Sequence, residues 1–398
     1  MMKALLNKNW NYLINSIAVL FGLFVLLPFK AKPYLVVLLF LVSALSYFYK
    51  KGNEKRAIKK GIPILLLFII ALVSLCYTSN LNEGWKIIGR MIPLALPLAF
   101  CLLTDDDRDL FFKTFRKVFV PSCVLYTILI FIYLNQLGCF SGDMSLNYGY
   151  SYIMFEFWGI NDHPIYISTY FVIALFFLLE WELKPRIVSY LLFIILFSGL
   201  LILSRKGSII SFLLCVLVFF FSKKSKGYWI KGSFIIVLIS LCMMLIPEIK
   251  YRFLELVSVD RIVENPETST GIRYIVWKTS AELIQKAPVL GYGIGDVQDV
   301  LNQSYIDKEY DQLAVDTYNA HNQFIQIVLS SGIIGLVLFL AGTIFLYRQF
   351  IASKEKIGLL ILTFFLIVFL TESYLERQNG IIFYSLIMSM FIYKKART

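Results

Sequence analysis

Charged and metal-binding side chains are scarce in this chain. Only 16% of its 398 residues are charged, and it contains two histidines and six cysteines. No C-x-x-C or H-E-x-x-H pattern occurs, the histidines stand in separate loops, and five of the cysteines lie within apolar runs. Zinc sites and disulfide frameworks need such patterns. We therefore expect neither a metal site nor a disulfide framework.

Features of a nucleotide-binding or nucleic-acid-binding protein are also missing. The run from Gly291 to Gly295 resembles a phosphate-cradling loop, but no strand precedes it. We interpret it as a flexible turn packing near a membrane. The net charge of +12 would suit a nucleic-acid-binding protein, but the lysines and arginines are instead distributed between the apolar runs as in a membrane protein with positively charged cytoplasmic loops. The sequence therefore predicts neither ATP nor nucleic acid as a partner.

Long apolar runs dominate what is present. Hydrophobic residues make up 59% of the chain, and apolar runs of roughly 17–22 residues can each cross a hydrocarbon core. We predict an all-α polytopic membrane protein of about twelve transmembrane helices. The predicted spans are 12–28, 33–49, 62–78, 85–103, 118–137, 164–180, 187–203, 207–221, 231–247, 322–347, 357–372 and 380–393. Because no small-residue cleavage site follows the first run, we expect it to be retained as a helix.

The basic residues assign sides to these spans. With the N-terminus inside, the predicted cytoplasmic segments hold 24 of the 38 lysines and arginines. Both termini are then cytoplasmic, and the two substantial external segments are 138–163 and 248–321. The predicted organisation is helices one to nine in 1–247, a large external loop subdomain in 248–321, and helices ten to twelve in 322–398. An amphipathic helix is expected at 272–285 within that subdomain.

Two arginines on the external face are candidates for binding an anion. Arg205, followed by Lys206, occupies a very short turn between spans seven and eight, and a guanidinium matches phosphate oxygens in a bidentate fork. Arg273 stands near the start of the amphipathic helix, where a helix N-terminus also favours an anion. The alternatives are a turn that snorkels to lipid phosphates for Arg205 and Lys206, and an ordinary solvated arginine for Arg273.

His321 is the candidate proton carrier. It stands at the start of the tenth span in the pattern H-N-(nine residues)-G-x-x-G, which ends at Gly335. An imidazole can take or give a proton near neutral pH, and Tyr318 and Asn322 beside it can form hydrogen bonds. The alternative is an interfacial histidine that caps a helix.

Four further polar residues lie at the predicted external ends of helices. His163 opens the sixth span, where a structural role in helix initiation would also explain its surroundings. Glu372, Glu376 and Arg377 stand at the end of the eleventh span, with the two glutamates four residues apart on one expected helical face. These residues either order a basic substrate site or form a solvated helix end.

The combination of these elements resembles the O-antigen ligase and polymerase family of membrane proteins. The histidine run from His321 to Gly335 matches the histidine signature of that family, and Ser204-Arg205 looks like its membrane-edge arginine. Gly271-Ile272-Arg273 with Trp277, followed by Pro288 to Gly293, resembles its long-loop arginine segment. The layout of twelve spans with the largest external loop between nine and ten is also similar.

This resemblance implies a GT-C-like, all-helical membrane glycosyltransferase in the bacterial inner membrane, with its active site at the periplasmic face. The implied donor is a glycan on undecaprenyl pyrophosphate, the implied acceptor of a ligase is a hydroxyl of lipid A–core, and neither metal nor ATP is required. In this reaction Arg205 and Arg273 would stabilise the diphosphate, while His321 would act as general base with inversion at the anomeric carbon. The remaining candidates (Lys206, Tyr318, Asn322, His163, Glu372, Glu376 and Arg377) would bind substrate.

Three alternatives stay open. A polymerase of the same family would use the same donor but a second lipid-linked repeat unit as acceptor, and a protein O-oligosaccharyltransferase would transfer the glycan to protein. A lipid-linked glycan transporter could also have twelve spans. Transporters, however, tend to carry internal repeats and charged or broken helices at mid-bilayer, and here no repeat is found and the polar candidates gather at one face.

Overall fold

The computed structural model of this chain describes residues 2–50, 58–181, 185–221 and 268–394. Every regular element in these residues is helical, which confirms the all-α prediction. The predicted span 231–247 and residues 248–267 of the predicted loop subdomain lie outside the described residues. The helices are α1 (Met2–Gly22), α2 (Lys32–Lys50), α3 (Ile58–Ser74), α4 (Leu81–Met91), α5 (Leu96–Leu102), α6 (Asp105–Gln136), α7 (Leu146–Phe155), α8 (Pro164–Glu180), α9 (Arg186–Leu203), α10 (Lys206–Phe221), α13 (Ser269–Lys286), α14 (Val297–Ile306), α15 (Asp311–Val315), α16 (Gln323–Ala352), α17 (Lys356–Phe369) and α18 (Gln378–Ile392), with 3-10 turns η1 (Phe24–Leu26), η2 (Phe29–Ala31), η4 (Ile92–Ala95) and η6 (Tyr374–Glu376).

Several of these helices are apolar enough to cross a bilayer. Within the described residues, five helical segments have the required length and hydropathy: Phe29–Tyr49, Leu81–Leu102, Asp105–Gln136, Arg186–Leu203 and Gln323–Ala352. Four shorter apolar helices, α8, α10, α17 and α18, accompany them. An integral membrane protein follows from this set, because a helix satisfies all its own backbone hydrogen bonds in lipid. The count of twelve spans remains a prediction.

Some helix boundaries differ from the predicted spans for identifiable reasons. The first helix ends at Gly22, before the predicted limit of 28, and the chain continues through 3-10 turns around Pro28. The predicted span 85–103 is divided into α4, η4 and α5, with Pro93 and Pro97 at the start of the second and third pieces. Helix α6 begins at Asp105 rather than 118, because Thr104 caps it and three aspartates favour its positive N-terminal end.

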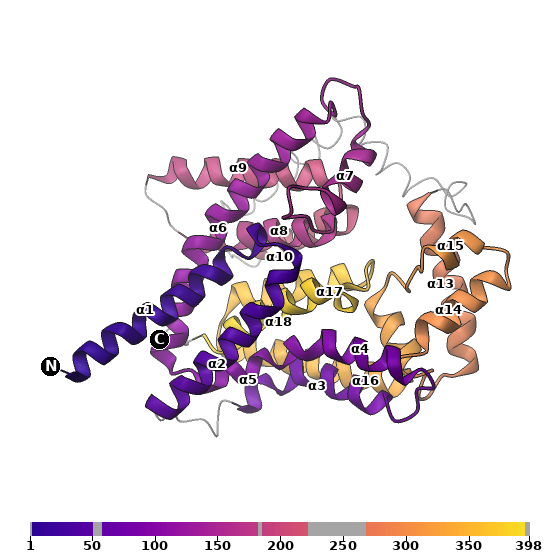
Figure 1. Ribbon diagram of the computed structural model, residues 1–398, viewed down its shortest axis with the longest axis horizontal. Helices are drawn as coiled ribbons and strands as arrows, with labels where there is room; N and C mark the ends of the chain where they lie inside the picture. Colours follow the sequence, from indigo (N-terminus) through magenta and orange to yellow (C-terminus); the bar gives the residue numbers. More distant parts are fainter. Residues whose placement is uncertain (1, 51–57, 182–184, 222–267, 395–398) are drawn as a thin grey trace.

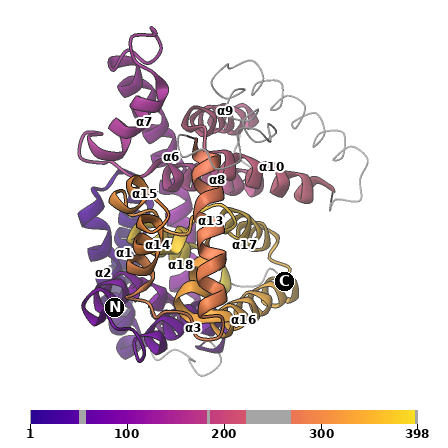
Figure 2. The same ribbon diagram turned by 90° about the vertical axis from the view of Figure 1, so that its right-hand side faces the viewer.

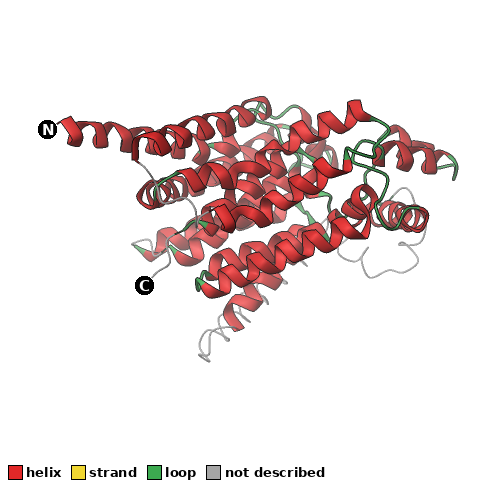
Figure 3. Cartoon of the chain, turned by 90° about the horizontal axis from the view of Figure 1, so that it is seen from below, coloured by secondary structure: helices red, strands yellow, loops and turns green. Residues whose placement is uncertain are grey.

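The helices pack as a bundle with the loop subdomain at one end. The two termini lie at the opposite end from α13, α14 and α15, and the long helices run between the two ends (Figures 1 and 3). Figure 2 views the loop end directly, and there α13 stands in front of the bundle, where it packs on α16. The residues that precede α8, α10, α16 and α18 all belong to this end.

Helices α8 and α18 form the centre of the bundle. Nearly every residue of both is buried, so neither shows a polar face. Aromatic rings fill the space between them and α6: the Phe112 ring lies 5.3 Å from that of Phe391 and 6.0 Å from that of Phe177, both in edge-on contacts. This packing fixes the helix ends that carry the candidate site.

A buried ion pair ties three helix starts together at the loop end. Lys32 Nζ lies 2.8 Å from Asp162 Oδ2, and neither side chain is more than 4% exposed. The same carboxylate oxygen accepts hydrogen bonds from Tyr170 Oη and Asn379 Nδ2. Because Lys32, Asp162 and Asn379 stand at the starts of α2, α8 and α18, the network sets the relative position of these helices. Sequence reasoning did not single out this pair.

Breaking this pair is expected to destabilise the protein strongly. Lys32→Met leaves Asp162 as an unpaired buried charge, which typically costs about 3–5 kcal/mol, whereas Lys32→Met with Asp162→Asn removes both charges and restores most of that loss. Thermal unfolding of the purified protein in detergent measures both. As the control, Lys86→Met breaks an exposed pair with Glu83, for which a change of about 1 kcal/mol or less is expected. Equal destabilisation by the two lysine variants would contradict this role.

Candidate active site at the loop end of the bundle

His321 is held in a fixed position just before α16. Its backbone adopts a left-handed conformation with φ of +43°, and its N–H donates to Asn319 Oδ1 at 3.0 Å. The next residue, Asn322, caps α16 by accepting from the N–H groups of Phe324 and Ile325. A left-handed conformation at a residue other than glycine is uncommon and needs such support from its surroundings.

Neighbouring elements also hold the peptide that precedes His321. The Ala320 carbonyl accepts from Trp277 Nε1 at 3.0 Å, and the Ala320 N–H donates to Gln326 Oε1 at 3.2 Å. The Tyr318 ring lies 5.5 Å from the imidazole. Trp277 therefore connects α13 to the segment that carries His321. The position of Trp277 four residues after Arg273 in the sequence did not predict this contact.

Glu372 joins His321 to Arg273. One carboxylate oxygen of Glu372 lies 3.1 Å from His321 Nδ1, and the other lies 2.7 Å from Arg273 Nη2. Arg273 also donates from Nε to the Thr371 carbonyl at 3.3 Å. Burial would raise the pKa of Glu372, but the hydrogen bond from His321 and the positive charge of Arg273 outweigh it and hold this pKa well below its usual range.

This arrangement orients the imidazole for proton transfer. A carboxylate next to Nδ1 favours the tautomer that carries its proton on that nitrogen, which leaves Nε2 with a lone pair. A nitrogen held in this way can accept a proton from a hydroxyl group. Glu372 thus serves as an orienting carboxylate for His321 within this cluster of three residues.

The Arg205 turn lies against the same loop. Ser204 ends α9 in a left-handed conformation, Arg205 follows, and Lys206 is the first residue of α10. The Arg205 guanidinium carbon lies 5.4 Å from the centre of the Tyr150 ring. Gly207 contacts Thr371 so closely that a Cβ there would lie 2.5 Å from Thr371 Oγ1. The turn that carries Arg205 is therefore next to the segment that carries Glu372.

His163 stands at the start of α8, where the charges of two arginines act on it. It precedes α8 and accepts a hydrogen bond at Nδ1 from the Ile165 N–H at 3.3 Å. Burial and the charges of Arg205 and Arg377 lower the pKa of His163 to about 3. Contacts of neighbouring residues agree with this influence, since Gly207 packs against Thr371 and Asn379 donates to Asp162, the residue before His163. Arg377, which is exposed, is the residue before α18.

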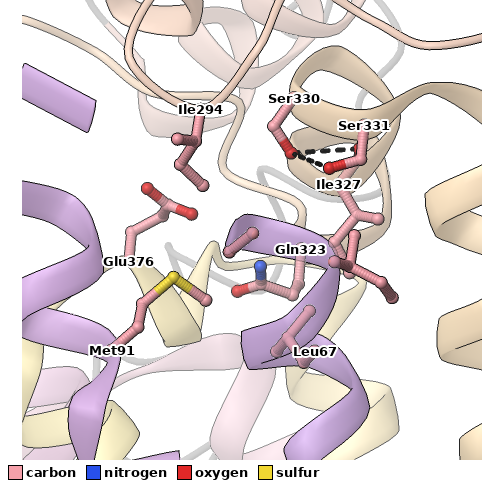
Figure 4. A pocket seen from close by; sticks show the side chains of 10 residues that line it. Leu67, Met91, Ile294, Gln323, Ile327, Ser330, Ser331 and Glu376 are labelled. Carbon is pink, nitrogen blue, oxygen red and sulfur yellow. Dashed lines mark hydrogen bonds between the residues drawn. The ribbon is translucent and has the colours of Figure 1, made fainter. Parts of the chain in front are cut away.

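Glu376 points into a different environment from Glu372. The expectation that the two share one helical face is wrong, because α17 ends at Phe369 and the 3-10 turn η6 follows. Glu376 lines a cavity of about 20 Å³, room for one water molecule, together with Met91, Ile294 and Gln323 (Figure 4). Burial raises the pKa of Glu376 to about 7, against the charge of Arg90 and a hydrogen bond to Gln326.

The raised pKa of Glu376 predicts a pH dependence of stability. The folded protein keeps this proton up to about pH 7, whereas an unfolded chain releases it near its ordinary pKa of 4.5. Stability is therefore expected to fall by up to roughly 3 kcal/mol as pH rises from 4.5 to 7, and Glu376→Gln should lack this decrease. Unfolding temperatures of both proteins at several pH values test this, with the exposed Glu309→Gln as control. If the stability of Glu376→Gln decreased with pH as steeply as that of wild type, a group other than Glu376 would be responsible for the decrease.

The glycine-rich segment is tightly packed against α16. Gly332 interrupts α16 with φ of +63° and ψ of −168°, and the freed carbonyls of Leu329 and Ser330 accept from the N–H groups of Tyr292 and Gly293. A Cβ on Gly332 would clash with the Val289 carbonyl. The expected flexible turn is thus a docked segment, and the two glycine motifs lock α16 to the loop subdomain.

The structure therefore brings the sequence-predicted residues together in distinct ways. His321, Glu372 and Arg273 are in direct contact, Asn322 caps α16, and Arg205, His163 and Arg377 gather beside them. Lys206 begins α10, Tyr318 packs on the imidazole, and Glu376 occupies a neighbouring cavity. Sequence reasoning gave Gln326 no role, and it did not predict the contacts that Asp162 and Trp277 make. The polar run Thr371-Glu372-Ser373 at the end of an apolar span was the signal in the sequence for a loop that takes part in the site. In the structure this loop contacts the histidine segment, since Ser373 Oγ accepts a hydrogen bond from the Asn322 N–H.

Two comparisons with known proteins show what this chain is similar to. A curated uncharacterized protein from Haemophilus influenzae (strain ATCC 51907 / DSM 11121 / KW20 / Rd) is similar over 138 residues with 24% identity, which covers 32% of this chain and 35% of that protein. The matched region thus spans about a third of that relative's length. The family model described as O-antigen ligase matches residues 190–340, a range that holds Arg205, Arg273 and His321. Over these residues, which make up less than half of the chain, the protein is similar to the O-antigen ligase family.

Proposed function

We propose that this protein is an O-antigen ligase. It transfers a glycan from undecaprenyl pyrophosphate to a hydroxyl of lipid A–core at the periplasmic face of the bacterial inner membrane. The observation that carries the proposal is the contact of His321 and Arg273 with one carboxylate, Glu372, within a chain that matches the O-antigen ligase family model. The apolar helices support a membrane location, where a lipid-linked donor would reach the site.

The proposed reaction needs one proton acceptor and one anion-stabilising region. The acceptor hydroxyl oxygen attacks the anomeric carbon of the donor sugar and gives its proton to His321 Nε2. The bond between that carbon and the pyrophosphate oxygen breaks, and undecaprenyl pyrophosphate leaves with the bonding electrons. Attack from the side opposite the leaving group inverts the anomeric centre.

The charged side chains match these two demands. Glu372 orients His321 and stabilises the imidazolium that forms, and Arg273 holds Glu372 in place through a 2.7 Å ion pair. Arg205 lies beside the same loop, where a fixed positive charge stabilises the charge that develops on the leaving diphosphate.

The glycolipids of a strain that lacks this protein test the proposal. Loss of all O-glycan from lipid A–core, with long undecaprenyl-linked polymer left behind, is the expected result. A core that carries a single repeat unit would instead identify a polymerase. A strain with normal lipopolysaccharide but an unglycosylated surface protein would identify a protein O-oligosaccharyltransferase. Reconstituted vesicles that move the lipid-linked glycan without transferring it would identify a transporter.

A further inference from the structure

Arg273 already has a carboxylate partner and is therefore poorly placed to be the main ligand of a phosphate. Its Nη2 pairs with Glu372, its Nε donates to the Thr371 carbonyl, and its Nη1 donates to the Ser269 carbonyl at 3.3 Å. The charge of Arg273 is largely compensated by Glu372. A diphosphate that gains charge as it leaves needs cations and hydrogen-bond donors elsewhere in the site.

Three helices begin near one another beside this cluster. His163 precedes α8, Arg205 precedes α10 and Arg377 precedes α18. The hydrogen bond from Asn379 Nδ2 to Asp162 Oδ2, 2.8 Å long, holds the first turn of α18 against the residue before His163. Both Arg205 and Arg377 act electrostatically on the His163 imidazole. Helix N-termini carry partial positive charge, so these three add to the two guanidinium groups.

His163 supplies a hydrogen-bond donor in this place. Because Nδ1 accepts from the Ile165 N–H, the neutral imidazole carries its proton on Nε2. No hydrogen bond of Nε2 with another described residue is found, and Arg377 forms no ion pair within the described part of the chain. A neutral donor at a helix start that shares this end of the bundle with two cations suits the bridging and terminal oxygens of a diphosphate.

We propose that His163 and Arg377 bind the diphosphate of the lipid-linked donor together with Arg205, and that Arg273 acts as a positioning residue for Glu372 and His321. The substrate class is a polyprenyl diphosphate, in which two adjacent phosphates span the starts of α8, α10 and α18. This inference rests on the proposed function for the identity of the donor, but the anion site itself is defined by this chain's own residues.

Binding of farnesyl pyrophosphate to the purified full-length protein in detergent tests the subsite without any transfer. Loss of a charge-assisted hydrogen bond typically costs about 1.5–3 kcal/mol, which corresponds to roughly a 10- to 100-fold weaker Kd. Arg377→Gln and His163→Phe are each expected to weaken binding by about that factor. His163→Gln keeps a neutral N–H donor and should stay within about threefold of wild type. Arg273→Gln should bind farnesyl pyrophosphate within about threefold while slowing transfer strongly.

Matched controls separate local from general effects. Arg186→Gln removes an exposed arginine at the opposite end of α9 and should change neither binding nor transfer. Because Arg377 is exposed, Arg377→Gln is expected to fold normally, which unfolding temperature verifies. Farnesyl monophosphate should bind more weakly than the pyrophosphate to wild type and lose this difference in Arg377→Gln.

The outcomes distinguish this inference from the proposed function. Unchanged pyrophosphate affinity in both Arg377→Gln and His163→Phe would overturn the subsite even if glycan transfer is confirmed. A loss of affinity in Arg273→Gln as large as in Arg377→Gln would overturn the positioning role of Arg273. If the variants lose pyrophosphate binding as expected but no glycan reaches lipid A–core, the subsite stands and the ligase assignment fails.

Discussion

Replacing His321 by asparagine is expected to lower glycan transfer by roughly 10²–10⁴-fold, the usual contribution of a general base. Asparagine tolerates the left-handed backbone that this position requires, and its amide can still donate to Glu372, but it cannot accept the hydroxyl proton. The expected loss is therefore in kcat, with the donor KM little changed. Transfer from purified lipid-linked glycan to lipid A–core, measured in detergent, gives both constants.

The control for His321→Asn is a change of similar size in the loop subdomain. Gln312→Ala alters an exposed residue of α15 whose side chain pairs only with Asp316 among the described residues, and it should leave transfer unchanged. Unfolding temperature verifies that His321→Asn is folded. Transfer by His321→Asn at near-normal kcat would remove the general-base assignment, while a loss of protein from the membrane would indicate that the residue acts through structure.

Replacing Glu372 by glutamine is expected to lower kcat by about 10²-fold or more. A neutral amide no longer selects the imidazole tautomer that presents a lone pair at Nε2, and it leaves Arg273 without its charged partner. The same substitution should destabilise the fold by about 3 kcal/mol, because Arg273 becomes a partly buried unpaired cation. Glu372→Gln with Arg273→Gln should recover stability without recovering transfer, which separates the catalytic from the structural contribution.

The low pKa of Glu372 gives this prediction a pH signature. A carboxyl whose pKa is depressed on folding contributes stability that is present above its ordinary value of 4.5 and lost as pH falls below it. Glu372 therefore stays ionised throughout assays between pH 5.5 and 9. The stability advantage of wild type over Glu372→Gln should therefore not shrink as pH falls from 9 to 5.5. A difference that disappears between pH 7 and 5.5 would show that Glu372 takes up a proton there.

The sequence alone determined the kind of protein and most of its helices. Apolar runs become helices because each helix satisfies its own backbone hydrogen bonds, which is a local property that composition and period reveal. The start of α8 at Pro164 and the end of α9 at Leu203 agree with the predicted 164–180 and 187–203. Prolines within an apolar run were harder to interpret, so the division of Leu81–Leu102 into three pieces was not predicted.

The sequence also singled out several residues of the candidate site, because His321, Arg205 and Arg273 are chemically conspicuous in a chain with few charges. Only the tertiary structure decided how they are connected. Glu372 contacts His321, which lies 51 residues away in the chain, and Arg273, which lies 99 residues away. Gly332 interrupts α16 and allows the helix to contact a segment about forty residues earlier in the chain. Such pairings depend on which helix ends the bundle brings side by side. Local pattern therefore identified the groups, and long-range packing alone assigned Glu372 to His321 and Glu376 to a separate cavity.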